Sequence, residues 1–312
     1  MLIRKAVKTE VSKIVTLIRK SLGESLVKKS EEIWQYKHID NPFGESYVLV
    51  AEENQELIGV RAFMQWRWQI QDALWVSYRA VDTATHPSHQ GKGIFTKLTT
   101  QALKDVQEIS EAFVFNTPND KSRPGYLKMG WQSVGKIKVA LIPSWFYFFY
   151  LLKKNGFTKN TISDNQLKEI CNVHNSQLES KKVLFTPKSV AYLTWRYENN
   201  PMQRYKIVSS SNWYLAMYVK KHRFYNELRV VETIGGITKA QKRQMKHVIV
   251  KFALQNNCFL ITMSNPEMFK LKLYGSFGPM LTFKSLTDSD DFVNKALDIE
   301  HWQYALGDLE LF

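Results

Sequence analysis

The spacing of apolar residues predicts that strands and helices alternate along the first 140 residues. Four apolar residues that share one helix face, Val11, Ile14, Val15 and Ile18, predict an amphipathic helix near the start of the chain. The same reasoning predicts, in order, a strand at 2–7, a helix at 7–19, strands at 47–51 and 57–64 with a hairpin turn at 53–55 between them, a strand at 75–83, a helix at 94–109, a strand at 112–116 and a short helix at 124–129. The predicted apolar face of the helix at 94–109 consists of Ile94, Leu98, Ala102, Val106 and Ile109. This order is typical of a mixed α/β fold, in which helices cover a twisted mixed sheet.

A loop with two glycines precedes the long predicted helix. It reads Gln90-Gly91-Lys92-Gly93-Ile94. Glycine lets the backbone approach a ligand closely, and unpaired amides at a helix N-terminus attract anions. The spacing fits neither the GxGxxG loop of dinucleotide-binding proteins nor the GKS/T ending of a Walker loop, which argues against an ATPase. The loop therefore predicts an anion site, with a purely structural turn as the alternative.

The order of elements recurs in the second half of the chain. Five short matches appear in the same order, and their offset falls from 161 to 148 residues. They pair Trp34-Gln35-Tyr36 with Trp195-Arg196-Tyr197, Asn41-Pro42 with Asn200-Pro201, Tyr47–Val50 with Tyr205–Val208, Val81-Asp82-Thr83 with Val231-Glu232-Thr233, and Tyr126 and Gly130 with Tyr274 and Gly278. Ordered matches of this kind indicate a duplication. We therefore predict a lobe at 1–140, a connector at 141–180 and a second lobe at 181–312.

The composition indicates a folded, basic protein. The chain has 312 residues, 44% of them hydrophobic and 13% aromatic, and a formal net charge of +14. Aromatic side chains supply apolar area for a core, which argues against disorder, and the length favours two domains. The positive charge favours an anionic ligand, such as a nucleotide, a nucleic acid or an anionic membrane surface.

No segment of the sequence is suited to crossing a membrane as a helix. The most apolar stretch, residues 140–152, is shorter than the about 20 residues that a spanning helix needs, and it predicts a buried connector or a lid. The first residues lack the apolar region of a signal peptide, and Cys171 and Cys258 are too few for a disulfide framework. We therefore expect a cytoplasmic protein. The cysteines and histidines have no metal-ligand spacing, so we expect no metal.

Two motifs resemble the GNAT superfamily of acyl-CoA-dependent N-acetyltransferases. The glycine loop is similar to the family's pyrophosphate pattern Q/R-x-x-G-x-G/A, although Phe95 stands where Gly or Ala is usual. One strand later, the sequence resembles the family's N-x-x-A-x-x-x-Y-x-x-x-G-F motif, with Asn119, Ser122, Tyr126, Gly130 and Trp131 at the motif positions. Ser replaces Ala and Trp replaces Phe. The resemblance covers residues 1–140 well and the second half weakly.

The resemblance implies that acetyl-CoA is a co-substrate. Two parallel strands, at 80–85 and 112–116, would splay apart to admit the pantetheine arm, and the amides of the glycine loop would hold the pyrophosphate. The implied acetyl-CoA-binding residues are Thr83, Thr85, Gln90, Gly91, Lys92, Gly93, Ile94 and Asn119. A backbone amide near Thr83 or Thr85 would stabilise the oxyanion.

The resemblance also implies two catalytic residues. Tyr126 would give its proton to the departing thiolate, with a packed core tyrosine as the alternative reading. Asp82 is the candidate base for the incoming ammonium, although strand alternation can turn its side chain away from the thioester. An ordinary paired carboxylate and a water chain are the alternatives to this role.

The second copy lacks the glycine loop. Thr238, Lys239 and Ala240 stand before its helix, and Gly235-Gly236 come too early for the same turn. We therefore expect a degenerate second lobe that shapes the acceptor site, and one acetyl-CoA per chain. The expected acceptor is a primary amine of a small molecule or an amino sugar, and a homodimer is compatible with the sequence.

Two other functions stay open at this stage. Duplicated GNAT-like lobes also occur in the Fem family of aminoacyl transferases, which use charged tRNA, and the net charge of +14 is compatible with RNA. A basic, non-enzymatic adaptor for nucleic acid or a membrane, which would use residues 144–152 and its lysines, is the third reading. Fem-type proteins generally lack an intact acyl-CoA glycine loop, so we favour acetyl transfer and expect no stable nucleic-acid partner.

Overall fold

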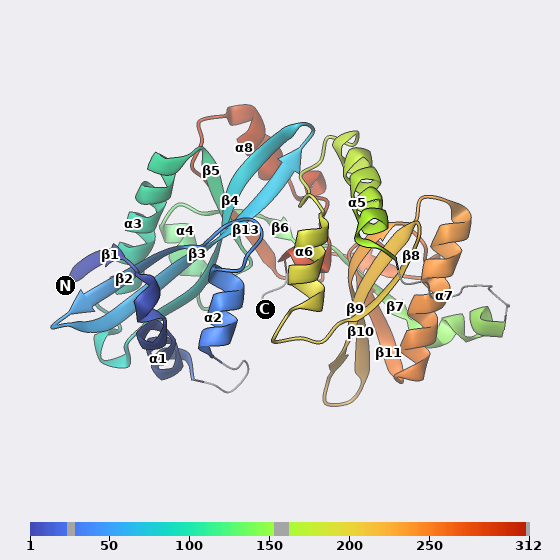
Figure 1. Cartoon of the computed structure of the whole chain (residues 1–312), viewed down its shortest axis with the longest axis horizontal. Coiled ribbons are helices and arrows are strands. Elements are labelled where there is room, and N and C mark those ends of the chain that lie inside the picture. Colours follow the sequence, from blue (N-terminus) through green and yellow to red (C-terminus); the bar gives the residue numbers. More distant parts are fainter. Residues whose placement is uncertain (24–28, 153–161, 310–312) are drawn as a thin grey trace. The chain divides into compact units, whose positions relative to one another are not determined.

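The computed structural model describes residues 1–23, 29–152 and 162–309, and it divides into two compact units (Figure 1). Each unit is assembled from two separate stretches of the chain. The first unit comprises residues 1–135 and 279–301, and the second comprises residues 136–278 and 302–312. The lobes expected from the sequence are continuous stretches of chain. In the structure, residues 136–140 belong to the second unit and residues 279–301 belong to the first.

The first unit is a seven-stranded mixed sheet with helices on both faces. Its elements are β1 (Leu2–Lys5), η1 (Lys8–Glu10), α1 (Val11–Leu22), α2 (Glu31–His38), β2 (Tyr47–Glu53), β3 (Glu56–Ile70), β4 (Ala73–Thr85), η2 (Pro87–His89), α3 (Ile94–Ile109), β5 (Ala112–Asn116), α4 (Arg123–Lys128), β6 (Gln132–Lys136), β13 (Met280–Ser285), α8 (Asp290–Ala296) and η5 (Ile299–His301). The strand order is β1-β2-β3-β4-β5-β13-β6. Strands β4 and β5 run parallel, whereas β1 to β4 pair antiparallel.

Helix α3 packs closely on the sheet because β3 carries a glycine beneath it. A Cβ atom at Gly59 would lie 2.6 Å from Cγ2 of Ile94, closer than real side chains come. Buried residues Ile94, Leu98, Ala102 and Val106 of α3 lie in one core cluster with side chains of β2 to β5. The predicted helix face is thereby confirmed at these four residues, whereas the prediction for Ile109 is wrong, since its side chain is 63% exposed at the end of α3. The start of α3 is fixed against the sheet.

The second unit has a six-stranded sheet of related topology. Its elements are β7 (Val139–Pro143), η3 (Ser144–Leu152), α5 (Asp164–Glu179), α6 (Val190–Leu193), η4 (Thr194–Glu198), β8 (Lys206–Ser210), β9 (Trp213–Lys221), β10 (Asn226–Gly235), α7 (Lys239–Gln255), β11 (Cys258–Met263), β12 (Leu273–Gly275) and α9 (Leu306–Leu309). The strand order is β12-β7-β11-β10-β9-β8, and β10 and β11 run parallel. The mixed α/β class predicted for the chain is confirmed.

Two strands are exchanged between the halves of the chain. Strand β13, which follows the last strand of the second sheet, lies between β5 and β6 of the first. Strand β7, which follows β6, lies between β11 and β12 of the second. Each sheet therefore receives one interior strand from the other half of the sequence. The predicted connector at 141–180 contributes η3, α5 and most of β7 to the second unit.

Two sequence predictions of local structure can be compared with the structure, the hairpin turn at 53–55 and the match between Tyr126 and Tyr274. Asn54 and Gln55 both have positive φ, 51° and 65°, as the tight turn of the predicted hairpin requires. The proposed match between Tyr126 and Tyr274 is wrong in structural terms. Tyr126 lies on helix α4, whereas Tyr274 lies half-exposed on the edge strand β12.

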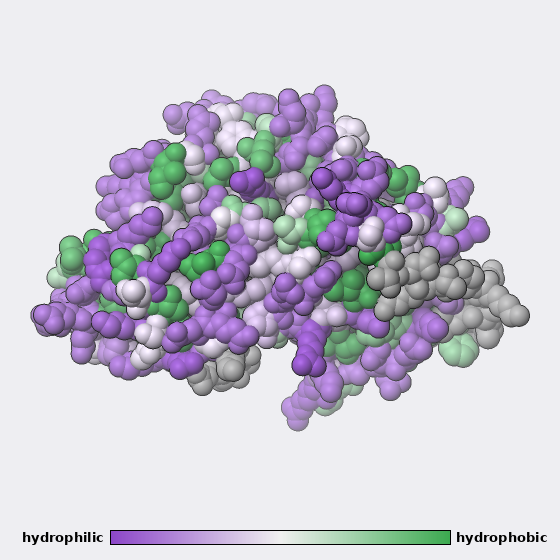
Figure 2. Space-filling view, in the orientation of Figure 1, coloured by the Kyte–Doolittle hydropathy of each residue, from purple (hydrophilic) through white to green (hydrophobic). Residues whose placement is uncertain are grey.

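The apolar stretch at 140–152 forms most of β7 and the short helix η3. Tyr147 of η3 is buried and donates a hydrogen bond to the carbonyl of Leu271, whereas Trp145 and Phe146 are half-exposed. On the face in Figure 2, hydrophilic residues predominate, and apolar ones occur singly or in small groups. Among the helices of the described ranges, none is long and apolar enough to cross a membrane.

Candidate functional site

The family resemblance implied that residues 80–85 and 112–116 splay apart. On β4 the separation begins after Arg79, but residues 112–115 of β5 are paired with residues 76–79. Their parallel pairing ends at Arg79 and Phe115, but β4 continues to Thr85. Beyond Arg79, the side of β4 that faces β5 has no strand partner, so its backbone groups are free to bind an extended ligand.

The glycine loop presents a row of unpaired amides beside this gap. Gly91 and Gly93 have φ of 78° and 74°, a conformation that glycine adopts at no steric cost. Gly93 is the N-cap of α3, and no side chain caps this helix. Within the described ranges, the amides of Gly91 to Thr96 have no hydrogen-bond acceptor. An uncapped helix N-terminus with neighbouring free amides suits a phosphate group.

A hollow of about 300 Å³ joins the gap and the loop. Its lining residues are Ser21, Thr83, Ala84, Thr85, His89, Gln90, Gly91, Gly93, Ile94 and Phe95. Six of the eight predicted acetyl-CoA-binding residues are therefore brought together. Lys92 is exposed in the same loop, where its ammonium is available to a phosphate. Within the hollow, the side chain of Gln90 donates a hydrogen bond to the carbonyl of Thr85 over 3.5 Å.

The free amides, the open space above the glycines and the unpaired strand side fit acetyl-CoA. A Cβ atom at Gly91 or Gly93 would contact nothing within 4 Å, so the loop faces open space. In this arrangement the loop amides would hold the pyrophosphate, and β4 would pair with the pantetheine arm. When bound, acetyl-CoA supplies the activated acyl group.

Asn119 stabilises the turn before α4. Its Oδ1 accepts hydrogen bonds from the amides of Lys121 and Ser122 and from the hydroxyl of Ser122. Asn119 was predicted to bind acetyl-CoA, but its side-chain oxygen accepts hydrogen bonds from its own turn instead. Its structural effect is to fix the start of α4, the helix that carries Tyr126.

Tyr126 lies in the core beneath the loop. Its side chain is 4% exposed, and its ring packs at right angles to that of Phe95, with centroids 5.7 Å apart. Phe95 itself lines the hollow, so the ring of Tyr126 contacts a residue of the hollow's wall. The hydroxyl oxygen of Tyr126 accepts a hydrogen bond from Nη1 of Arg61 over 3.0 Å.

Asp82 is the extra residue of a β-bulge. Arg61 pairs with Thr83 and Ala62 with Val81, which leaves Asp82 without a partner on β3. Its φ of 40° is unusual for a residue other than glycine. The bulge breaks the alternation of the strand and aims the carboxylate at helix α2.

On α2, the Asp82 carboxylate forms an ion pair with Lys37 and accepts a hydrogen bond from Nε2 of His38 over 2.9 Å. The hydroxyl of Ser46 donates a hydrogen bond to Nδ1 of His38 over 2.8 Å. Burial alone would raise the pKa of Asp82, but Lys37 and His38 together hold it well below its usual range. Burial lowers the pKa of His38, so its imidazole is neutral at pH 7. A carboxylate held ionised in this way is a weak base.

The second unit has a similar gap between two parallel strands, but the N-terminus of the helix beside it, α7, is capped by a side chain. The pairing of β10 with β11 ends at Arg229 and Thr262, while β10 continues to Gly235. At the start of α7, the Thr238 hydroxyl accepts a hydrogen bond from the amide of Gln241, whose side chain accepts one from the amide of Thr238. This capping box occupies amides that are free in the first unit. Steric space is also lacking, because a Cβ at Gly235 would lie 2.2 Å from the carbonyl oxygen of Asn212.

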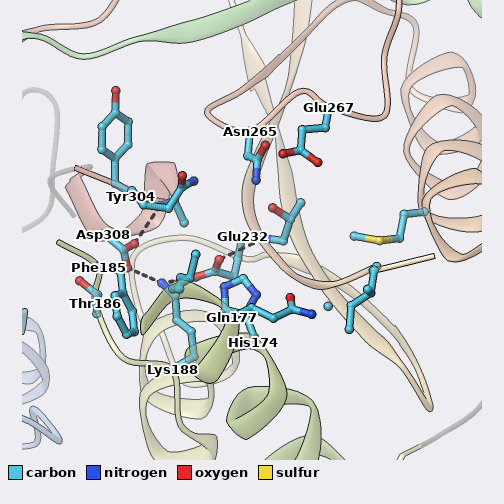
Figure 3. Close-up of a pocket in the computed structure, with 18 of the residues that line it drawn as sticks. His174, Gln177, Phe185, Thr186, Lys188, Glu232, Asn265, Glu267, Tyr304 and Asp308 are labelled. Atoms are coloured by element: carbon cyan, nitrogen blue, oxygen red, sulfur yellow. Dashed lines mark hydrogen bonds and ion pairs between the residues drawn. The ribbon is translucent and has the colours of Figure 1, made fainter. Parts of the chain in front are cut away.

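A pocket of about 190 Å³ lies at this second gap (Figure 3). On one side of it, Lys188 lies between two carboxylates, with Nζ 2.8 Å from Glu232 and 2.6 Å from Asp308. His174 and Gln177 of α5 face the pocket beside this cluster, and Asn265 and Glu267 lie across from them (Figure 3).

The buried cluster in this pocket is internally paired. Burial would lower the pKa of Lys188, but Asp308 and Glu232 raise it above its ordinary value. Burial and the neighbouring Asp308 raise the pKa of Glu232. The hydroxyls of Tyr192 and Tyr197 donate hydrogen bonds to Asp308 and Glu232, respectively. Such a network stabilises the second unit rather than presenting a free reactive group.

Sequence reasoning missed three residues near the site. Lys37 and His38 pair with Asp82, and Arg61 contacts Tyr126. Arg61 had a detectable signal, since it is a charged residue inside the apolar run Ile58–Met64. Lys37 and His38 had none, because a polar pair at the end of an amphipathic helix is normally solvated.

Comparisons with known proteins agree with this geometry. Residues 2–134 match the family model of the acetyltransferase (GNAT) domain. A GCN5-related N-acetyltransferase from Anabaena variabilis superposes with a TM-score of 0.68 at 11% identity, over 92% of this chain and 73% of that chain. A probable N-acyltransferase from Enterococcus faecalis gives 0.70 at 11% identity, over 91% and 72%. A GCN5-related N-acetyltransferase from Kribbella flavida gives 0.66 at 10%, over 91% and 70%. No curated protein matches the sequence.

At these identities, the solved structures establish the fold alone, and the family assignment rests on the domain match. Residues 2–134 are therefore assigned as a GNAT acetyltransferase domain. By this domain, the protein is an enzyme of the N-acetyltransferase type.

Proposed function

We propose that this enzyme transfers an acetyl group from acetyl-CoA to a primary amine of a small molecule or an amino sugar. The observation that carries the proposal is the row of unpaired amides from Gly91 to Thr96, at the uncapped start of α3 beside the free side of β4. A diphosphate and an extended pantetheine arm need these two features side by side.

In this reaction, Tyr126 gives the proton that the departing thiolate takes up. The free side of β4 near Thr83 and Thr85 supplies an amide for the oxyanion. Asp82, weakened as a base by its ion pair, positions the bulge and thereby the free amides that follow it. The amine loses its proton through water.

The second unit is proposed to bind no acetyl-CoA, because its helix cap occupies the amides that a diphosphate would use. The compartment is proposed to be the cytoplasm. Both cysteines are free and buried, as expected in a reducing compartment.

Calorimetric titration of the full chain with acetyl-CoA tests the donor. We expect one site per chain, and a ligand concentration of 100 times Kd should add about 2.7 kcal/mol to the free energy of unfolding. A stoichiometry near two would contradict the assignment of the second unit. Absence of binding, together with binding of aminoacyl-tRNA, would favour the aminoacyl-transfer alternative.

Release of free thiol from acetyl-CoA then identifies the acceptor. We would compare amino sugars, polyamines and aromatic primary amines under saturating acetyl-CoA, and verify the acetylated product by mass spectrometry. A tertiary amine of similar size is the matched control, because it cannot form an amide.

A further inference from the structure

Arg61 is a fully buried cation on β3, next to the candidate proton donor. Its side chain is 0% exposed, and it donates a hydrogen bond from Nη1 to the hydroxyl oxygen of Tyr126. Its Nε and Nη2 have no hydrogen-bond acceptor in the described part of the chain, and no carboxylate there pairs with it. Among the described residues, Tyr126 is therefore the one hydrogen-bond partner of the guanidinium.

Aromatic rings surround the rest of the guanidinium. Its Cζ lies 5.0 Å from the ring centroid of Phe63, 5.3 Å from that of Tyr126 and 5.5 Å from that of Phe95. Ring faces attract a cation without neutralising it. Arginine does not lose its proton in proteins, so a permanent positive charge lies at the hydroxyl of Tyr126.

Two buried lysines of the same chain have carboxylate partners. Lys37 pairs with Asp82, and Lys188 lies between Glu232 and Asp308. Burying a charge without a counter-charge is costly, so a cation that lacks one indicates that an anion forms or binds beside it. For Arg61, the adjacent group that can become an anion is Tyr126.

The hydrogen bond also fixes the direction of the tyrosine proton. The oxygen of Tyr126 accepts from Arg61, so its own proton must point away from the guanidinium. Tyr126 donates no hydrogen bond to any residue that the structure describes. Its proton is therefore available to an acceptor that arrives with the substrate.

The proposed reaction generates that acceptor. The amine nitrogen uses its lone pair to bond to the thioester carbonyl carbon, and the C–S bond breaks with its electron pair remaining on sulfur. Sulfur takes the proton of Tyr126, which yields free thiol and a tyrosinate. The surplus proton on nitrogen returns to the tyrosinate through water. A charge-assisted hydrogen bond from Arg61 stabilises this tyrosinate.

We propose that Arg61 is a positioning residue for acyl transfer, which directs the proton of Tyr126 toward the departing sulfur and stabilises the resulting tyrosinate. This inference rests on the proposed role of Tyr126 as proton donor. It adds a residue that acts on the chemical step without contacting acetyl-CoA.

A double-mutant cycle on the full chain tests the inference, with wild type, Arg61→Met, Tyr126→Phe and the double variant. The assay is thiol release from acetyl-CoA with the best acceptor from the panel above. Arg61→Met should lower kcat about 10- to 100-fold, as expected for a lost charge-assisted hydrogen bond. The calorimetric Kd for acetyl-CoA should change less than about twofold, since the residue acts on the transition state.

In the Tyr126→Phe background, Arg61→Met should change kcat less than about twofold, because the hydroxyl through which Arg61 acts is absent. Equal losses of kcat in both backgrounds would overturn the inference and leave Tyr126 as the donor. Full kcat in Tyr126→Phe alone would remove the donor role as well, while one-site binding of acetyl-CoA would still support acetyl transfer.

Arg61→Lys is the conservative variant, because it keeps the charge and loses the planar fork. It should recover part of the kcat that Arg61→Met loses, and a loss equal to that of methionine would contradict a role for the charge. Thermal unfolding checks each variant. If Arg61→Met fails to fold, the cycle with Arg61→Lys decides the question by the same criterion of coupling to Tyr126.

Discussion

Gly93 is the N-cap residue of helix α3, and Thr238 is the N-cap residue of helix α7. Of the two, only Thr238 has a side chain that caps its helix. The Thr238 hydroxyl accepts a hydrogen bond from the amide of Gln241 over 3.2 Å, whereas no side chain caps α3. One helix therefore has its own acceptor, and the other is open to an external anion.

Substitution of Gly93 should weaken acetyl-CoA binding through the backbone. With φ of 74° and nothing within 4 Å of its Cβ position, the residue is constrained by conformation rather than by neighbours. A left-handed conformation costs other residues about 1–2 kcal/mol, so Gly93→Val should raise Kd about tenfold or more by calorimetry. Gly93→Asn should be milder, because asparagine tolerates this region.

Thr238→Ala is the matched control for the loop variants. It should cost about 1 kcal/mol of stability through the lost cap, and the Kd for acetyl-CoA should stay unchanged. An equal loss of affinity in Thr238→Ala and Gly93→Val would contradict the different roles of the two helix ends.

Asp82→Asn distinguishes positioning from proton abstraction. Because Lys37 and His38 hold the pKa of Asp82 well below its usual range, the pH profile of kcat/KM should keep its acidic limb in the variant. Stability should fall by up to about 3 kcal/mol, because Lys37 loses its counter-charge. Addition of Lys37→Met should restore part of that loss in urea unfolding. Disappearance of the acidic limb would identify Asp82 as the base.

Lys188→Met should strongly destabilise the protein, because Glu232 and Asp308 would then lie buried without their shared cation. Removal of one partner of a buried pair typically costs about 3–5 kcal/mol. Asp308→Asn in the same chain should recover part of that free energy, which urea unfolding would measure. Equal stability of the single and double variants would argue that the carboxylates do not repel each other.

His174 should make stability depend on mildly acidic pH. Burial, with a smaller effect of Lys188, lowers its pKa to about 4. The pKa of a histidine in the unfolded chain is about 6.5. Between about pH 4 and about pH 6.5, the unfolded chain therefore binds a proton at this residue and the folded chain does not. Stability should fall as pH drops from about 7 to 4, by at most about 3 kcal/mol from this residue. His174→Gln should flatten the curve, and an unchanged slope would exclude His174 as its source.

The sequence predicted features that depend on local periodicity and glycine chemistry. The buried face of α3 was predictable, because Ile94, Leu98, Ala102 and Val106 recur at helical spacing. So was the hairpin turn at Asn54 and Gln55. The loop was predictable as well, since its glycines stand where the chain needs positive φ.

Features that depend on distant partners were not predictable. Period-two alternation cannot foresee the bulge at Asp82, since one extra residue turns its side chain toward α2. The pattern of β13 indicates a strand but not the sheet that receives it. Arg61 could be noticed as a charge in an apolar strand, but its contact with Tyr126 joins residues 65 positions apart.

The place of β13 has a consequence for biosynthesis. Both GNAT-like motifs lie within the first 131 residues, yet the sheet that positions them is complete only with Met280–Ser285. During translation, this edge of β5 therefore stays unpaired until β13 has left the ribosome, and long-range pairing of this kind folds slowly. A stop codon between residues 132 and 279 would spare both motifs and still leave an exposed, aggregation-prone edge in the sheet that carries them.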